Sequence, residues 1–372
     1  MTDEQLTELR KAAGTELPRA WPAPPWEGLY RCSPEDFQVE EELGFEPDGQ
    51  GEHLFLWVEK TGTNTGFLAE ELARRAGIPA NNVSFSGMKD RHAVTRQWFS
   101  LHLPGQADPD LSQLNAEQWQ VLKAVRHSRK LKRGVHRGNH FRLRIQISQA
   151  DTSTGNWLKE RWKLLQEQGV PNYFGPQRFG SGGQNINRGL QWLTSTRKQR
   201  KPRRQDKSLW LSSLRSALFN LWVAAAIQRG DWNRALPGGC FNLASSRSRF
   251  SAQSEEPLAE LQARVETLDL HPTGPLAGRG QPEVVDQALE QEQDFFIPWQ
   301  ELVEHLANQG LHQERRSQRL VPEQTDFVWE APWLTLSFYL PSGSFATSLL
   351  REIVKAQDVQ QSDYGKLLKC SQ

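Results

Sequence analysis

The stretch NHFRLRIQI, residues 139–147, has the two-residue period of a strand that is buried on one side only. Successive side chains of a strand point to opposite faces. One face therefore carries Phe141, Leu143, Ile145 and Ile147, and the other carries His140, Arg142, Arg144 and Gln146. We expect the first face to belong to a hydrophobic core and the second to form a basic surface.

Further strand and helix patterns flank this stretch on both sides. They predict strands at 35–45, 51–62, 81–87, 96–103 and 333–341. They predict helices at 63–79, 156–171, 213–230 and 345–354. In the first helix Thr65 is the expected N-cap, and Phe67, Leu68 and Leu72 share one face.

The chain length of 372 residues exceeds the usual limit of one hydrophobic core, so two domains are expected. Residues 165–321 have helices and an acidic block of their own and are predicted to be an inserted domain. The residues on either side of them form a strand-rich core. A strand-rich core interrupted by a helical insertion is an α+β arrangement.

Charge is segregated along the chain although the net charge is only +1. Residues 35–52 hold eight Asp or Glu and no Lys or Arg, and 281–306 hold seven acidic residues and again no Lys or Arg. In contrast, 126–144 hold eight Lys or Arg and three His, and 197–204 hold six Lys or Arg. Such basic runs are typical of a polyanion partner. For 197–204 a solvated basic loop is an equally good interpretation.

The three cysteines, Cys32, Cys240 and Cys370, stand in no metal-binding or disulfide spacing, which favours a reducing compartment. The N-terminus lacks the apolar run of a signal peptide, and no stretch is predicted to span a membrane. We therefore expect a cytoplasmic protein.

Asp90 is the one acidic residue in SGMKDRHAVTRQWFSLHL, residues 86–103, in which five residues are Lys, Arg or His. It lies in a connection between two predicted strands, and with these cations nearby we expect its carboxylate to be ionised at neutral pH. That state suits a nucleophile or an electrostatic stabiliser. From composition alone, an Asp that bonds its own backbone in a tight turn is the favoured interpretation.

Nucleotide, zinc and serine-hydrolase motifs are missing, since the chain has no GxxxxGK[ST], GxGxxG, HExxH or GxSxG pattern. Asn139 is either part of a turn before the basic strand or an amide offered to a base edge or to the carboxylate. Residues 172–185 place Tyr173, Phe174 and Phe179 beside Arg178 among glycines, which suits either base stacking or a loop with core aromatics. Phe37 and Phe345 alone favour core positions.

Six motifs in this order resemble the TruD family of tRNA pseudouridine synthases. They are EDFQVEE, KTGTNT, FSGMKDRHAVTRQ, RGNHF, NYFGPQRFG and YLPSGSFATSLLRE, and together they span most of residues 30–355. The resemblance implies a pseudouridine-synthase catalytic domain with a mixed, largely antiparallel sheet at 1–164 and 322–372. It also implies an inserted α/β TRUD domain at 165–321 and a V-shaped basic cleft.

The resemblance further implies that Asp90 is the catalytic residue and that Phe37, Asn139 and Phe345 form the nucleobase pocket. Lys89, Phe141 and Arg178, which lie in or beside the same motifs, are assigned to substrate binding. The implied substrate is uridine 13 in the D arm of tRNA, and the reaction needs no cofactor and no metal. We expect a monomer, because the pocket and the cleft are complete within one chain. Two other functions stay open: a non-catalytic RNA-binding protein that uses the same cleft, and an RNA hydrolase.

Overall fold

The structure, a computed structural model, describes residues 1–14, 16–194, 202–244, 248–253 and 255–360. The chain divides into two compact units. The sheet unit comprises 24–162, 322–343 and the residues from 353 on, and the helical unit comprises 1–23, 163–321 and 344–352. The predicted domains differ from these units at 1–23 and 344–352, which group with the middle of the chain. The assignment of a catalytic and an inserted domain stays a prediction.

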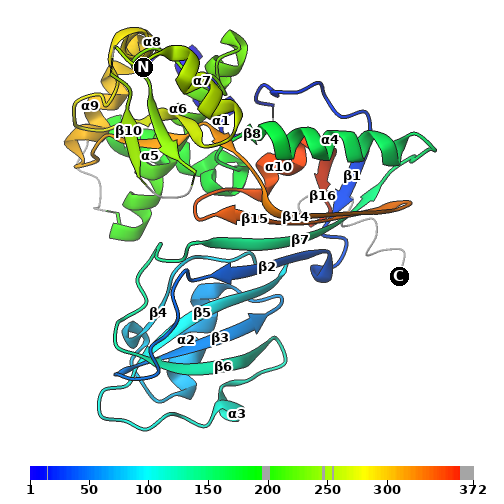
Figure 1. The fold of residues 1–372 in the computed structure, drawn as a ribbon. Helices are drawn as coiled ribbons and strands as arrows, with labels where there is room; N and C mark the ends of the chain where they lie inside the picture. The colour runs from blue at the N-terminus through cyan, green and yellow to red at the C-terminus, as the bar shows by residue number, and fades with distance from the viewer. Residues whose placement is uncertain (15, 195–201, 245–247, 254, 361–372) are drawn as a thin grey trace. The chain divides into compact units, whose positions relative to one another are not determined.

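A mixed ten-stranded sheet forms the centre of the sheet unit (Figure 1). Its main path runs β14, β15, β7, β2, β5, β3, β6, while β1 pairs with β7 and β16, and β4 pairs with β5. The bounds are β1 Glu27–Tyr30, β2 Phe37–Glu42, β3 His53–Lys60, β4 Val83–Phe85, β5 Val94–His102, β6 Trp119–His127, β7 Gly138–Ile147, β14 Glu323–Glu330, β15 Trp333–Pro341 and β16 Lys355–Asp358. The pairs β2–β5 and β1–β16 are parallel and the others antiparallel. The prediction of a mixed α+β fold is confirmed.

Strand β7 has the two faces that its sequence predicts. It pairs with β15 on one side and with β2 on the other. Leu143 and Ile145 are fully buried, whereas Arg142 and Arg144 are exposed. Buried apolar and exposed basic residues therefore alternate along β7, as expected for a sheet that packs against a core on one face only.

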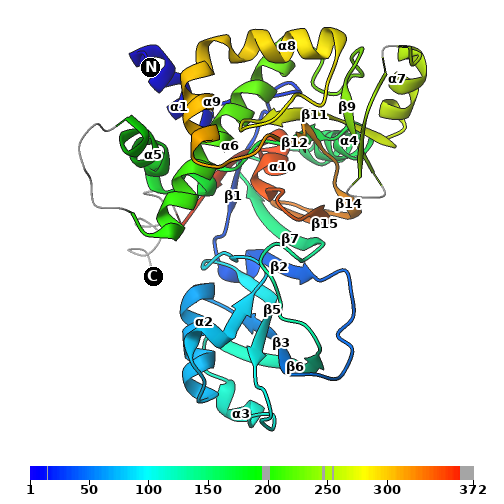
Figure 2. The ribbon, with the colours of Figure 1, turned by 90° about the vertical axis from the view of Figure 1, so that its left-hand side faces the viewer.

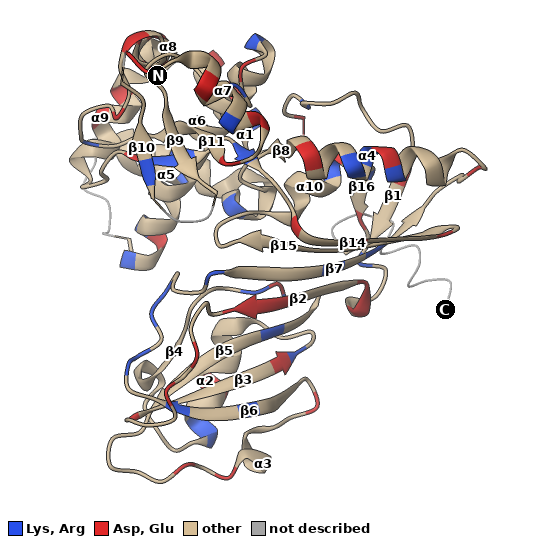
Figure 3. Cartoon of the chain, in the orientation of Figure 1, with Lys and Arg blue, Asp and Glu red and all other residues tan. Residues whose placement is uncertain are grey.

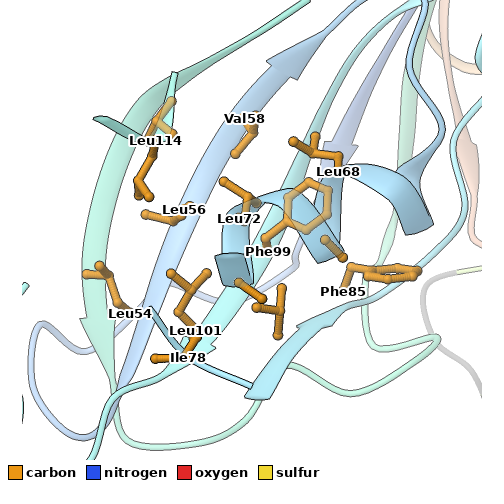
Figure 4. Close-up of a cluster of buried hydrophobic side chains, with 14 of the residues drawn as sticks. Leu54, Leu56, Val58, Leu68, Leu72, Ile78, Phe85, Phe99, Leu101 and Leu114 are labelled. Atoms are coloured by element: carbon orange, nitrogen blue, oxygen red, sulfur yellow. The ribbon is translucent and has the colours of Figure 1, made fainter. Parts of the chain in front are cut away.

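Helix α2, Thr65–Arg75, covers one face of β3, β5 and β6 (Figures 2 and 4). Leu68 and Leu72 are fully buried against Leu56 and Phe99, as the helical period predicts. Two details of the prediction are wrong. Phe67 is 54% exposed, because it lies at the edge of the packed stripe, and the N-cap is Asn64, which leaves the Thr65 hydroxyl free for contacts described below.

Two further helices belong wholly or partly to the sheet unit. The short α3 spans Leu111–Leu114, and α4 spans Thr154–Gln168 and continues into the helical unit. Within the sheet unit Trp162 of α4 packs on Phe338 of β15, with ring centroids 6.0 Å apart. Helix α4 therefore covers the apolar face of the sheet at this point.

The helical unit is built around the 26-residue helix α6, Arg204–Arg229, to which α1, α5 and β11 pack (Figure 2). Its other helices are α1 Asp3–Ala12, α5 Gln184–Thr194, α7 Leu258–Glu266, α8 Asp286–Phe296, α9 Gln300–Asn308 and, except for its last residue, α10 Ala346–Ile353. Its strands are β8 Val170–Pro171, β9 Cys240–Leu243, β10 Arg249–Ser251, β11 Leu270–Leu276, β12 Glu314–Ser317 and β13 Arg319–Leu320. By length and composition α6 could cross a membrane, but 67% of its most apolar window is buried inside the protein, as in a core helix.

Candidate active site

Three of the predicted site residues share one face of the sheet. The register pairs Val39 with Phe141 and Glu41 with Asn139 between β2 and β7. Directly paired residues of neighbouring strands point to the same face, and so do residues two apart on one strand. Phe37, Asn139 and Phe141 therefore lie on the face that also carries Glu41.

The rings of Phe37 and Phe141 pack against each other within this face. Their centroids are 6.3 Å apart at an interplanar angle of 83°, and Phe141 stacks on Phe338 at 5.4 Å. Phe37 is only 5% exposed. It also contacts the Tyr30 ring, at a centroid distance of 6.2 Å, and the guanidinium of Arg31, whose Cζ lies 4.5 Å from the ring centroid. In this structure Phe37 is thus part of a packed aromatic cluster, as its apolar character alone favours.

The connection between β4 and β5, residues 86–93, is the loop that carries Asp90, and buried polar side chains hold it. The Thr65 hydroxyl accepts a hydrogen bond from the Lys89 backbone at 3.0 Å and donates to Gln97 Oε1 at 2.9 Å. Gln97 Nε2 donates to the Gly87 carbonyl at 3.1 Å. Thr65 and Gln97 are fully buried. Since buried hydrogen bonds are costly to break, this loop is held in one conformation.

The side chains of Lys60 and Lys89 also stabilise this loop. Lys60 Nζ donates to the carbonyls of Thr63 at 2.8 Å and of Asp90 at 2.9 Å. Burial lowers the pKa of Lys60 to about 8, because an ammonium without water is disfavoured, although the Asp90 carboxylate opposes this. Lys89 Nζ lies 2.5 Å from Glu41 Oε2, and both side chains are buried. The cation of Lys89 is therefore occupied by Glu41, and its predicted contact with substrate stays a prediction.

The Asp90 carboxylate makes a different contact with each of its oxygens. Oδ1 accepts a hydrogen bond from the His92 backbone at 2.9 Å, which is the tight-turn contact that composition favours. Oδ2 pairs with Arg31 Nη2 at 2.9 Å. The side chain is 29% exposed. The turn and the ion pair fix the direction of the carboxylate while leaving part of it open to solvent.

Arg31 is the functional candidate that sequence reasoning missed. It has a left-handed backbone with φ of 60°, is 6% exposed, and lies against the rings of Tyr30 and Phe37 at 5.3 and 4.5 Å. Its Nε is a buried donor with no hydrogen-bond partner among the described residues. One sequence signal could have found it, because Arg31 is the single Lys or Arg between Arg19 and Lys60.

Asn139 offers an unused acceptor on the same face. It is 9% exposed, and its Oδ1 has no hydrogen-bond partner within the residues that the structure describes. Its backbone is fixed between Glu41 of β2 and Leu340 of β15. Buried polar atoms are usually hydrogen-bonded, so this oxygen is available to a donor that approaches it.

Phe345 and Arg178, the remaining predicted residues, lie in the helical unit and both contact Phe174. The rings of Phe345 and Phe174 are 5.8 Å apart at 62°, and the Arg178 Cζ is 5.7 Å from the Phe174 centroid. Arg178 Nε also donates to Ser216 Oγ at 3.3 Å, and burial lowers the pKa of its guanidinium. Of the residues singled out in 172–185, Arg178 therefore lies against Phe174, whereas Tyr173 and Phe179 are core residues, 2% and 0% exposed.

The connection between β6 and β7, part of the basic segment predicted to bind a polyanion, lines an open hollow of about 540 Å³, whose lining also includes Glu46 and Asp48. Lys and Arg follow this connection in Figure 3. Three exposed cations line the hollow, and we call them the basic loop: Arg129, Lys130 and Lys132. The exposed ring of Phe45 lies beside them and contacts His127, with ring centroids 5.3 Å apart at an interplanar angle of 30°. The second basic run, 197–204, lies for the most part outside the described residues. No cluster of three His, Cys, Asp or Glu suited to a metal ion occurs among the residues the structure describes.

Comparison with known proteins gives a consistent result. The family model described as tRNA pseudouridine synthase D (TruD) matches residues 18–187 and 200–353. A tRNA pseudouridine synthase D of Aeromonas salmonicida is 44% identical over 343 residues, which cover 92% of this chain and 94% of the relative. A tRNA pseudouridine synthase D of Methylococcus capsulatus is 43% identical over 341 residues, covering 91% and 94%.

A solved structure supports the fold. The crystal structure of a putative tRNA pseudouridine synthase D (TruD) from Methanosarcina mazei superposes with a TM-score of 0.69 at 20% identity, covering 95% of this chain and 99% of the other. Because the family model covers most of the chain and the relatives are similar over nearly their full length, the chain belongs to the TruD family.

Proposed function

We propose that this chain is a tRNA pseudouridine synthase that isomerises uridine 13 in the D arm of tRNA, with Asp90 as its catalytic residue. One observation carries the proposal. The Asp90 carboxylate, whose side chain is 29% exposed, is paired with the buried Arg31 at 2.9 Å, and buried hydrogen bonds hold the loop that carries it. Membership of the TruD family and the tRNA pseudouridine synthase names of its relatives support the reaction and the substrate class.

The isomerisation breaks the bond from N1 of uracil to C1′ of ribose and makes a bond from C5 to C1′. The C5 hydrogen leaves as a proton and N1 gains one, so the reaction needs no net oxidant, reductant or cofactor. Asp90 acts in its ionised form, either by attacking the nucleoside or by taking up a sugar proton on the way to a glycal. Arg31 Nη2 lies 2.9 Å from Asp90 Oδ2 and holds the carboxylate in one orientation.

The target base has to leave its stack before it reaches Asp90, which costs a few kcal/mol. Stacking on Phe37 and Phe345 and a hydrogen bond to Asn139 are proposed to compensate for this cost. The unpartnered Oδ1 of Asn139 is an acceptor that an N–H of uracil can fill. Phe141 supports Phe37 by packing edge to face, and Lys89 and Arg178 are proposed to aid substrate binding.

The RNA backbone is proposed to follow the basic loop and the remaining cations of 126–144. Neutralising phosphates there releases counterions, and the exposed Phe45 provides a face for an unpaired base. The V-shaped basic cleft between a catalytic domain at 1–164 and 322–372 and an inserted domain at 165–321, the monomeric state and the cytoplasmic location belong to the same proposal. The alternative is an RNA-binding protein without catalysis.

The reaction is tested by incubating the protein with tRNA that carries tritium at C5 of uridine. A synthase releases one tritium per pseudouridine formed, and chemical mapping of the product should locate the change at position 13. An RNA-binding protein would retain the label, and an RNA hydrolase would shorten the tRNA. Either of these two results would refute the proposed function.

A further inference from the structure

The last described strand brings a second carboxylate to Arg31. Strand β16 runs parallel to β1, with Asp358 registered opposite Tyr30, and the Val359 backbone donates to the Tyr30 carbonyl at 3.2 Å. Asp358 is 327 positions from Arg31 in the sequence. Chain pairing alone thus places this carboxylate beside the arginine of the candidate site.

Arg31 bridges the two carboxylates with two different nitrogens. Nη2 lies 2.9 Å from Asp90 Oδ2, and Nη1 lies 3.2 Å from Asp358 Oδ2. The side chains of Arg31 and Asp358 are 7% and 10% exposed, against 29% for Asp90. The planar guanidinium with its fixed fork of donors is suited to such a bridge. In this array of Asp358, Arg31 and Asp90, the Asp358 side chain is enclosed and the Asp90 side chain is the one most open to solvent.

Asp358 is itself held by several groups. Its Oδ1 accepts a hydrogen bond from the Gln360 backbone at 3.1 Å, and Tyr30 is paired with it across β1 and β16. The Tyr30 and Phe37 rings confine the guanidinium from the sides. A carboxylate held in this way fixes the position of the arginine rather than adapting to it.

We propose that Asp358, with Tyr30, is a positioning residue of the catalytic site, which holds Arg31 in place and limits the positive charge that Arg31 presents to Asp90. This inference rests on the proposed function. One guanidinium shared by two carboxylates leaves a net negative charge, so Asp90 keeps its orientation without being fully neutralised. The matched residues of the family model end at 353, so Asp358 lies beyond them.

The other charged groups near this array are engaged elsewhere or lie at the surface. Lys60 binds the backbone carbonyl of Asp90, and Lys89 is paired with Glu41. Arg91 donates to the Gly62 carbonyl at 3.0 Å and is exposed, as is His92. Burial raises the pKa of Asp358, against the lowering effect of Arg31, and the negative charge of Asp90 raises it further. Asp358 therefore takes up a proton at a higher pH than an ordinary aspartate does.

The test compares Asp358→Asn with the wild type in single-turnover pseudouridine formation from pH 5 to 9, together with tRNA affinity and the melting temperature. We expect the rate at neutral pH to fall about tenfold or more with tRNA affinity within about twofold. Asp358→Glu should restore most of the rate, because it keeps a carboxylate beside Arg31.

The control is Asp269→Asn, which removes a carboxylate paired with Arg264 at 2.7 Å on the surface of the helical unit and should leave the rate unchanged. A rate for Asp358→Asn within twofold of the wild type would overturn the proposal. So would a slower rate that Asp358→Glu fails to raise, because the effect would then not depend on a carboxylate at this position. An inactive wild type would instead refute the proposed function.

Discussion

The buried ammonium of Lys60 gives a prediction with a worked magnitude. Lys60 is fully buried, and its pKa is about 8 instead of the ordinary 10.5. Between these two values the unfolded chain binds a proton that the folded chain does not, so the free energy of unfolding should rise with pH. Two and a half pH units at about 1.4 kcal/mol each amount to about 3.5 kcal/mol, of which about 3 kcal/mol is gained by pH 10.5. Burial of the Lys60 ammonium thus lowers the free energy of unfolding by its full amount below pH 8, and this destabilisation is lost as the pH rises to about 10.5.

Replacing Lys60 by Met removes this titration. Urea denaturation of the wild type and of Lys60→Met at several values between pH 7 and 10.5 should show the wild type gaining about 3 kcal/mol on the variant as the pH rises. Lys159→Met on the exposed face of α4 is the matched control and should show no such gain. A difference between wild type and Lys60→Met that stays constant over this range would refute the reasoning, since it would mean that Lys60 titrates as in the unfolded chain.

Three further predictions concern the loop, the RNA and the base. Glu41→Gln leaves the Lys89 ammonium buried without a counterion and should cost about 3–5 kcal/mol of stability in urea denaturation, with recovery when Lys89→Met is added; an unchanged midpoint would contradict the buried pair. Replacing the three basic-loop cations with Ala should weaken tRNA binding and reduce the slope of log affinity against log salt by about 0.7 to 0.9 per lost phosphate contact, and an unchanged slope would point to another RNA path. Asn139→Ala removes the unused acceptor and should lower kcat/KM by about tenfold with folding intact, whereas wild-type kinetics would remove Asn139 from the base pocket.

The regular elements were predictable because their signals are local. The strand at 333–341 coincides with β15, and the faces of β7 follow from its two-residue period. The errors lie at element ends and edges, where competing contacts decide. Thr65 is free of its expected capping role because its hydroxyl serves the Asp90 loop, and Phe67 lies beyond the stripe that the sheet covers.

The candidate site could be predicted only in part. Asp90, Phe37 and Asn139 belong to motifs that a sequence displays, and the structure places all three in the sheet unit. The partners that hold Asp90 are different, because no local pattern reports them. Arg31 is an isolated cation, and Asp358 reaches it only through the pairing of β1 with β16. Long-range pairing of strands, rather than composition, decides which charges meet.

The central claim is that the Asp90 carboxylate performs the chemistry, and Asp90→Asn tests it most directly. The amide keeps the shape of the side chain and can still accept the hydrogen bond from the His92 backbone, but it lacks the negative charge. We predict that this variant binds tRNA with an affinity close to that of the wild type and releases no tritium from C5-labelled uridine above background. Tritium release at the wild-type rate by Asp90→Asn would contradict the account.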